Sequence, residues 1–206
     1  MPEEEIQLLD WVNLPPRAAL ISLWDCLHDA ELRGIGSNLL DRSLTLKFWS
    51  SYIPEFHGFP KELEFAFRLD GVQSARAFHW ELWPGGCSVP KGVSRDEENR
   101  LIAEYRAKWR EDSCSWPEVE LRLSREKQAP SVLEASFASG ENNENAIHLG
   151  VMLADGEYFN LFVRAERLSV SRSDGEPVDL GGFIRLGESY WKAYAARRKN
   201  RTGSSA

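Results

Sequence analysis

The sequence predicts an α+β fold, mainly antiparallel β-sheet built from hairpins, with about three flanking helices. Three patterns lead to this prediction. Apolar and polar residues alternate with the period of a strand in several segments, most clearly over residues 62–69. Asp-Gly pairs at 70–71, 155–156 and 174–175 are typical of tight turns, and strands joined by such turns are antiparallel. Apolar stripes with helical spacing occur near both ends and in the middle of the chain.

The first elements expected are a helix and two strands. Pro16 suits the first turn of a helix, and the spacing of the leucines that follow predicts a helix through residue 27. Residues 30–40 are predicted to form a strand. Residues 43–49 are predicted to form the next strand, with Leu44, Leu46 and Phe48 on one face.

The middle of the chain predicts a hairpin and a helix. Residues 62–69 and 72–83 would form the two strands, joined by a turn at Asp70-Gly71. Ser94 and Glu97 match a capping box, so a helix is expected to begin there. Residues 118–123 and 131–138 are both predicted to be strands.

The last third predicts a hairpin and a long helix. Residues 146–153 and 157–170 would pair around Asp155-Gly156, and Asp174-Gly175 would make another turn. Asp179 can cap a helix over 180–198, in which Gly187 lies on the apolar stripe and indicates close backbone packing. We expect one domain over residues 1–198 and a disordered basic and polar tail over 199–206.

Composition predicts a globular protein of the cytoplasm. Of the 206 residues, 42% are hydrophobic and 28% are charged, and no apolar run approaches the ~20 residues that span a bilayer. The acidic N-terminal residues do not resemble a signal peptide. Three widely spaced cysteines, Cys26, Cys87 and Cys114, include no CxxC pair, so free thiols in a reducing compartment are expected.

Charge is distributed unevenly along the chain. The formal net charge is −7, but residues 192–206 carry five basic and no acidic side chains, which leaves −12 on the rest. An acidic body repels phosphate backbones, so nucleic-acid binding by the body is disfavoured. The basic end would either complement the dipole of the last helix or contact nucleic acid weakly.

Motifs for catalysis or cofactor binding do not occur. The sequence contains no GxxxxGK[ST], GxGxxG, GxSxG or HExxH pattern, so no cofactor is expected and an enzyme is disfavoured. Cys26, His28, His79 and Cys87 have ligand types that suit zinc, but their spacing is not that of a zinc finger, so no metal site is predicted.

The candidate binding residues are His28, Asp29, Trp49 and Trp83. A histidine beside a carboxylate can act as a base or a metal ligand, or can instead hold the corner between a helix and a strand. Among the eight tryptophans, Trp24, Trp80, Trp109 and Trp191 fall on expected core faces. Trp49 and Trp83 fall on less certain faces, where an exposed ring would suit a protein partner or a sugar.

Two segments carry a family resemblance. Residues 23–32, Leu-Trp-Asp-Cys-Leu-His-Asp-Ala-Glu-Leu, followed by Leu44-Thr45-Leu46, resemble the opening of small uncharacterised bacterial α+β domains. Some of these domains are assigned to the immunity proteins of polymorphic toxin systems. The closing pattern Phe183-x3-Gly187-x2-Tyr190-Trp191 resembles the end of the same kind of family. The resemblance implies a cytosolic bacterial protein that binds another protein, and it implies no catalytic residue.

Together these patterns favour a non-enzymatic protein-binding domain. An acidic body suits a basic partner such as a nuclease toxin. The alternative is a small-molecule enzyme or a sugar-binding module centred on His28 and Asp29. The sequence leaves the oligomeric state open.

Overall fold

The structure, a computed structural model, describes residues 19–38, 40–80, 92–97, 100–101, 112–114, 116–139 and 145–203. These residues form a mostly antiparallel sheet with helices, which confirms the α+β class; four helices have defined bounds, where about three were predicted. The elements follow in the order β1 (Ala19–Ser22), α2 (Trp24–Leu27), β2 (Glu31–Asn38), β3 (Ser43–Trp49), α3 (Tyr52–His57), β4 (Glu64–Trp80), β5 (Asp112–Cys114), α5 (Trp116–Ser124), β6 (Ser131–Ser139), β7 (Asn145–Met152), β8 (Tyr158–Arg172), β9 (Pro177–Val178) and α6 (Leu180–Gly203).

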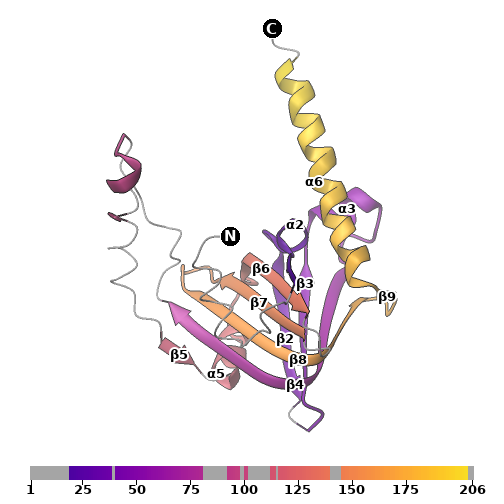
Figure 1. Cartoon of the computed structure of the whole chain (residues 1–206). Helices are drawn as coiled ribbons and strands as arrows, with labels where there is room; N and C mark the ends of the chain where they lie inside the picture. The colour runs from indigo at the N-terminus through magenta and orange to yellow at the C-terminus, as the bar shows by residue number, and fades with distance from the viewer. Residues whose placement is uncertain are drawn as a thin grey trace.

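Six strands of the sheet close into a ring. Each strand in the order β2-β3-β4-β8-β7-β6 pairs with the next in antiparallel orientation, and β6 returns to β2 (Figure 1). The β2–β6 joint is short, with Glu31 opposite Ser131 and the amide of Leu32 donating to Pro130 O at 2.8 Å. The ring is therefore a small antiparallel barrel, and β1, β5 and β9 pair with β6, β4 and β8 beside it.

The barrel encloses the hydrophobic core. Alternate residues of its strands point inward, as predicted for Leu44, Leu46 and Phe48 of β3, all of which are buried. Other strands contribute the buried residues Phe65, Phe67, Leu69, Val132, Phe137, Ile147, Leu149, Val151, Leu161 and Val163. A six-stranded barrel has room for little more than such side chains, so its interior is a core and not a ligand chamber.

The predicted hairpin at Asp70-Gly71 is wrong. β4 continues from Glu64 to Trp80 without turning, and it pairs with β8 along its length. Gly71 has a φ of +65°, and the register shifts between Val72 and Ser74. The positive φ of Gly71 therefore belongs to a local irregularity of one long strand, which bends there but does not reverse direction.

Two further secondary-structure predictions are wrong. The segment expected to be helical through residue 27 begins as strand β1, which pairs with β6, and only α2 is helical. The strand predicted over 118–123 lies within helix α5. The apolar residues of α5 are spaced by two, as in a strand, but only Val119 and Leu123, one helical turn apart, are buried. Leu121 between them is 50% exposed.

The predicted C-terminal elements are largely confirmed. β7 and β8 form a hairpin around Gly156, and Gly175 turns β8 into β9. The amide of Gly182 donates to Asp179 Oδ1 at 2.7 Å, so Asp179 caps α6. The helix continues to Gly203, beyond the predicted end at residue 198.

Helices α2, α3 and α6 gather at one end of the barrel, and α6 extends away from it (Figure 1). α5 packs against β2 and β4 instead. In the middle of the chain, the amide of Glu97 donates to Ser94 Oγ at 3.2 Å, as the capping box predicts. No helix in the described ranges is long and apolar enough to cross a membrane.

Candidate functional site

His28 and Asp29 lie at the corner between α2 and β2. The amide of His28 donates to Trp24 O at 2.9 Å and closes the single turn of α2. Asp29 then has a φ of +60°, and its amide donates to Val132 O of β6 at 3.0 Å. A left-handed residue directly after a helix redirects the chain, and aspartate tolerates this conformation better than most residues. The backbone amides of both residues therefore take part in the corner between α2 and β2.

The side chains at this corner form a group in which Trp24 and Asp29 are exposed and His28 is half-buried. The indole of Trp24 stacks on the His28 imidazole, with ring centroids 3.7 Å apart and an interplanar angle of 18°. His28 Nε2 lies 3.4 Å from Asp29 Oδ2. The Asp29 side chain is 67% exposed and Trp24 is 43% exposed. The prediction that Trp24 belongs to the core is wrong, because the shortness of α2 places this ring outside the barrel.

The backbone beneath Trp24 is held by α6. A Cβ on Gly187 would collide with the carbonyl group of Asp25 and would lie 2.8 Å from the amide nitrogen of Cys26, so α2 and α6 meet backbone to backbone. The indole N–H of Trp191 donates to Asp25 O at 2.9 Å. The predicted close packing at Gly187 is confirmed, and it holds the backbone of α2 against α6.

Two buried groups join α2 to its neighbours. The thiol of Cys26 donates to Phe183 O at 3.4 Å, and the hydroxyl of Tyr52 donates to His28 O at 3.0 Å. Burial raises the pKa of Cys26 to about 12, against a smaller lowering by a backbone hydrogen bond from Gly187. Burial also raises the pKa of Tyr52 above its usual range. Both groups therefore stay protonated and act as donors, and Cys26 is not a nucleophile.

Three carboxylates contribute negative charge near this corner. Burial is the main cause of the raised pKa of Cys26, and the negative charges of Asp25 and Glu188 raise it further. The charge of Asp29 likewise adds to the raised pKa of Tyr52, which burial mainly causes. We call Trp24, Asp25, His28, Asp29 and Glu188 the Trp24 surface. It combines one rigid aromatic ring with three carboxylates.

Trp49 has partners of its own. Its indole N–H donates to Lys61 O at 2.8 Å, and the guanidinium of Arg33 lies 4.1 Å from the ring centroid. Arg33 in turn contacts Glu31 at 2.9 Å and Glu62 at 3.2 Å. Among the described residues, the ring thus belongs to a cation–π and ion-pair group on the β2–β3 face, and it makes no hydrogen bond, ion pair or ring contact with His28 or Asp29. Trp83 and Cys87 lie outside the described residues.

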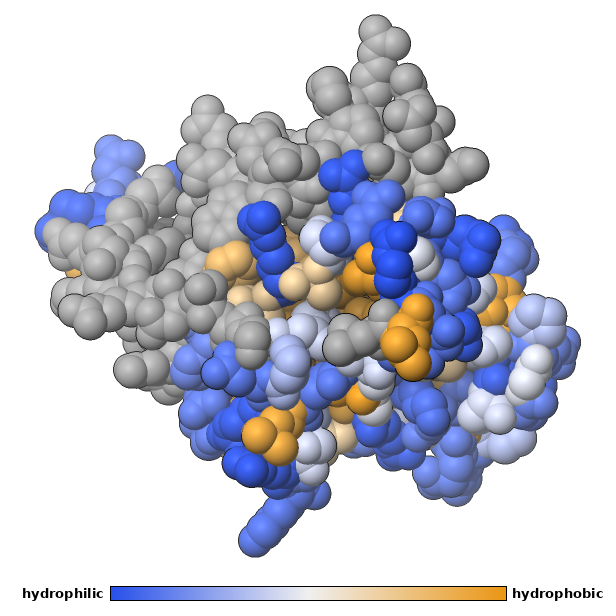
Figure 2. All heavy atoms as spheres, turned by 90° about the horizontal axis from the view of Figure 1, so that it is seen from below, coloured by the Kyte–Doolittle hydropathy of each residue, from blue (hydrophilic) through white to orange (hydrophobic). Residues whose placement is uncertain are grey.

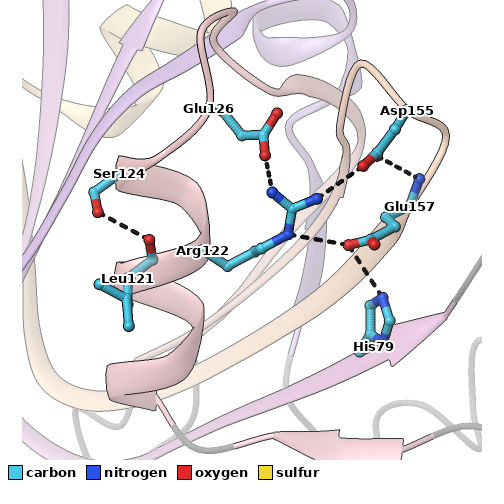
Figure 3. A network of polar contacts seen from close by, with 7 residues as sticks. All are labelled: His79, Leu121, Arg122, Ser124, Glu126, Asp155 and Glu157. Carbon is cyan, nitrogen blue, oxygen red and sulfur yellow. Dashed lines mark hydrogen bonds and ion pairs between the residues drawn. The ribbon is translucent and has the colours of Figure 1, made fainter.

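A second polar group fastens α5 to the barrel (Figure 3). Arg122 of α5 contacts Glu126, just after the end of the helix, and two residues of the turn between β7 and β8, Asp155 at 2.8 Å and Glu157 at 3.3 Å. Glu157 also lies 3.3 Å from His79 Nε2 of β4. Partial burial acts to lower the pKa of Arg122, but the hydrogen bond to Glu157 and the other carboxylates outweigh it and raise the pKa. One arginine shared among three carboxylates is a clamp between elements.

A third polar group, on the outer face of β6, β7 and β8, was missed by the sequence reasoning. Tyr158 is 1% exposed, and its side chain occupies the space above Gly150, where a Cβ would collide with the phenol oxygen. Tyr158 interacts with Glu134 of β6, and burial is the main cause that raises its pKa. Beside it, His148 Nε2 lies 3.0 Å from Oδ1 of Asn160, which is 2% exposed. An asparagine within the apolar run of residues 158–163 was the available signal for this group.

The polar groups described above do not form a metal-binding site. Within the described ranges, no three His, Cys, Asp or Glu side chains are arranged to hold a metal ion. Three residues of the zinc alternative have separate partners: Cys26 contacts α6, His28 contacts Trp24 and Asp29, and His79 contacts Glu157 and the ring of Phe159.

No family model, no curated protein and no solved structure matches this chain. The resemblance of residues 23–32 to a bacterial domain family therefore stays a prediction. Among the described residues, Trp24 is the largest aromatic side chain that is exposed.

Proposed function

We propose that this protein is a non-enzymatic binding protein and that the Trp24 surface docks a basic segment of another protein. Such a partner would present lysine or arginine side chains, as a nuclease toxin does to its immunity protein. The observation that carries the proposal is the exposed ring of Trp24, stacked on His28, whose Nε2 lies 3.4 Å from the Asp29 carboxylate.

The shape of the molecule supports a surface site. The inward-facing residues of the barrel are large and apolar and fill its interior. A binding site is therefore expected on the outer surface. The end of the molecule opposite α6, shown in Figure 2, is mostly hydrophilic among its coloured residues, with hydrophobic colour in small areas. Exposed apolar residues that occur singly are normal on any protein, whereas Trp24 is both large and fixed in position.

The aromatic part of the surface suits a binding hot spot. Tryptophan is enriched among residues that dominate binding energy, because it buries a large area and loses little side-chain entropy. Stacking on His28 and the anchoring of Asp25 O by Trp191 hold the ring before any partner arrives. Such preorganisation lowers the entropic cost of association.

The charged part of the surface suits a basic partner. Asp25, Asp29 and Glu188 all make the local potential more negative. A lysine or arginine placed over the open face of Trp24 would gain a cation–π interaction and a nearby carboxylate. Complementary charge would also speed the encounter, with a rate that falls as salt is added.

The alternative function is a sugar-binding module or a small-molecule enzyme at the same corner. It draws on the 3.4 Å contact between His28 Nε2 and Asp29 Oδ2 beside an open indole face, which is a geometry that also suits a sugar ring. A catalytic role would make turnover depend on the His28 imidazole, so His28→Ala would abolish turnover while changing the melting temperature little.

Affinity capture tests the proposal. The tagged full chain, its Trp24→Ala variant and its Leu121→Ala variant are incubated with lysate of the source organism at 50 and 300 mM NaCl. Leu121 is the matched control, since it is an exposed large apolar residue on another helix. We expect the wild type and Leu121→Ala to retain one stoichiometric basic protein, with less retained at the higher salt, and Trp24→Ala to lose it.

The outcomes separate the two functions. Equal capture by Trp24→Ala and wild type would overturn the proposed surface. Capture of no protein by folded wild type, together with a thermal shift on adding sugars that Trp24→Ala abolishes, would favour the sugar-binding alternative.

A further inference from the structure

The second half of α6 is a basic helix that leaves the body of the protein. The contacts of α6 with α2 and α3 involve residues in its first half, such as Gly187 with Asp25 and Tyr190 with Tyr52. Beyond these contacts the helix projects away from the barrel (Figure 1). Residues 192–203 carry five cations and no acidic side chain.

We propose that this projecting helix binds single-stranded nucleic acid, through phosphate contacts of its cations and stacking of a base on Tyr194. Tyr194 is 48% exposed, and Arg197 and Arg198 are also exposed. These three residues have i, i+3 and i+4 spacing and therefore share one face of the helix. An aromatic ring beside two guanidinium groups is the combination that single strands require, because bases stack and phosphates need cations.

The acidic body does not prevent this binding. At 1.5 Å per residue, Arg197 and Arg198 lie roughly 10 to 12 Å along the helix from Tyr190, which contacts Tyr52. The Debye length at physiological ionic strength is about 8 Å, so much of the field of the body is screened at these two arginines. The sequence thus places a net charge of −12 on residues 1–191 and +5 on residues 192–206.

The composition of the helix end favours nucleic acid over a lipid surface. A helix that lies in a membrane interface needs an apolar face of large residues such as Leu, Phe or Trp. Residues 192–203 contain none of these, and their apolar positions are alanines together with Tyr194. Charge alone would then have to hold the helix to a membrane, without any apolar burial to support it.

Fluorescence anisotropy with the full-length protein tests the proposal. The probes are a labelled 20-nucleotide RNA and a 20-base-pair DNA duplex, each titrated between 75 and 300 mM NaCl. We expect the RNA to bind with a Kd on the order of 10 µM near 150 mM salt and to weaken about tenfold for each doubling of salt, as five phosphate contacts require. The duplex should bind more weakly, since Tyr194 finds no unstacked base there.

Variants assign the binding to the helix. Arg197→Glu with Arg198→Glu should weaken RNA binding by more than tenfold, and Tyr194→Ala should weaken it by about tenfold without changing the salt dependence. The matched control is Arg125→Glu with Lys127→Glu, the same change of charge at exposed positions near α5, and it should change the Kd by less than about twofold. Circular dichroism checks that α6 stays helical in each variant.

Three results would overturn the proposal: no RNA binding at 75 mM salt, an equal loss in the control variant, or binding to phosphatidylserine vesicles in preference to RNA. Trp24→Ala should leave the RNA affinity unchanged, so this site can fail or hold independently of the Trp24 surface.

Discussion

Asp29 has a backbone conformation that few residues adopt, and its side chain is an exposed carboxylate beside His28. The same position therefore has a structural role and a proposed binding role. The backbone requires a residue that tolerates a φ of +60°, which includes aspartate, asparagine and glycine. The proposed partner requires the negative charge. Substitutions at residue 29 separate the two roles.

Asp29→Asn should leave the free energy of unfolding within about 0.5 kcal/mol of wild type, because asparagine tolerates the left-handed conformation. Asp29→Ala should lower it by about 1 to 2 kcal/mol, because a Cβ without local hydrogen bonding is strained there. Both variants should weaken binding of a basic partner. Urea unfolding measures the difference, and equal stability of the two variants would show that the backbone conformation is not the constraint.

Because the thiol of Cys26 is buried, we expect the free energy of unfolding to fall at alkaline pH. Burial raises its pKa from 9.0 to about 12. The stabilisation of the folded state that results from this higher pKa is complete below pH 9 and is lost as the pH rises toward 12. In that window the unfolded chain releases the thiol proton while the folded chain keeps it. The contribution lost is about 1.4 kcal/mol per pH unit. Urea unfolding of Cys26→Ala should therefore show a shallower decline between pH 9 and 11 than wild type, and parallel declines would contradict this assignment.

At the scale of elements, the crossing of α2 and α6 determines where the proposed binding residues lie. Gly187 lets the two backbones meet, Trp191 donates to Asp25 O, and Cys26 donates to Phe183 O. A helix of one turn has little stability of its own, so α2 depends on these tertiary contacts.

Gly187→Ala should destabilise the protein by about 1 to 3 kcal/mol, because the added methyl collides with the α2 backbone. The matched control is Gly36→Ala in β2, where an added Cβ meets no atom within 4 Å. Thermal unfolding compares the two variants. A Gly187→Ala protein as stable as Gly36→Ala would mean that the two helices do not meet as closely as described.

The sequence predicted those elements whose periodicity matches one local environment. β3 is buried on one face only, so its alternation was readable, and the β7–β8 hairpin had its Asp-Gly turn. α5 was predicted as a strand because its three apolar residues are spaced by two, although only Val119 and Leu123 face the core. β1 was predicted as helix because its pairing with β6, more than a hundred residues away, decides its conformation.

The candidate site was predictable in part. His28 and Asp29 were identified because they are adjacent and end an apolar stripe, and both lie on the surface proposed here. Trp24 was assigned to the core, since an extended helical stripe would have turned it inward. The groups around Tyr158 and Arg122 were not found, because each joins strands or helices that are distant in the sequence.

For the whole molecule, the residues that form the core and the residues proposed to bind partners lie in different parts: the core is inside the barrel, and the proposed binding residues are on or beside the helices outside it. The six-stranded ring encloses the apolar core, and the helices at one end present the Trp24 surface and the projecting half of α6. The two proposals assign oppositely charged partners to these two features: a basic protein to the first and a polyanion to the second. Changes to either should leave the barrel intact.

Site-specific crosslinking tests the central claim most directly. A photoreactive phenylalanine derivative replaces Trp24 in one variant and Leu121 in another, and both are irradiated in cells of the source organism. The proposal predicts a single crosslinked product from position 24, whose partner carries a basic surface, and none of that product from position 121. The same product from both positions, or a partner crosslinked from position 121 alone, would contradict it.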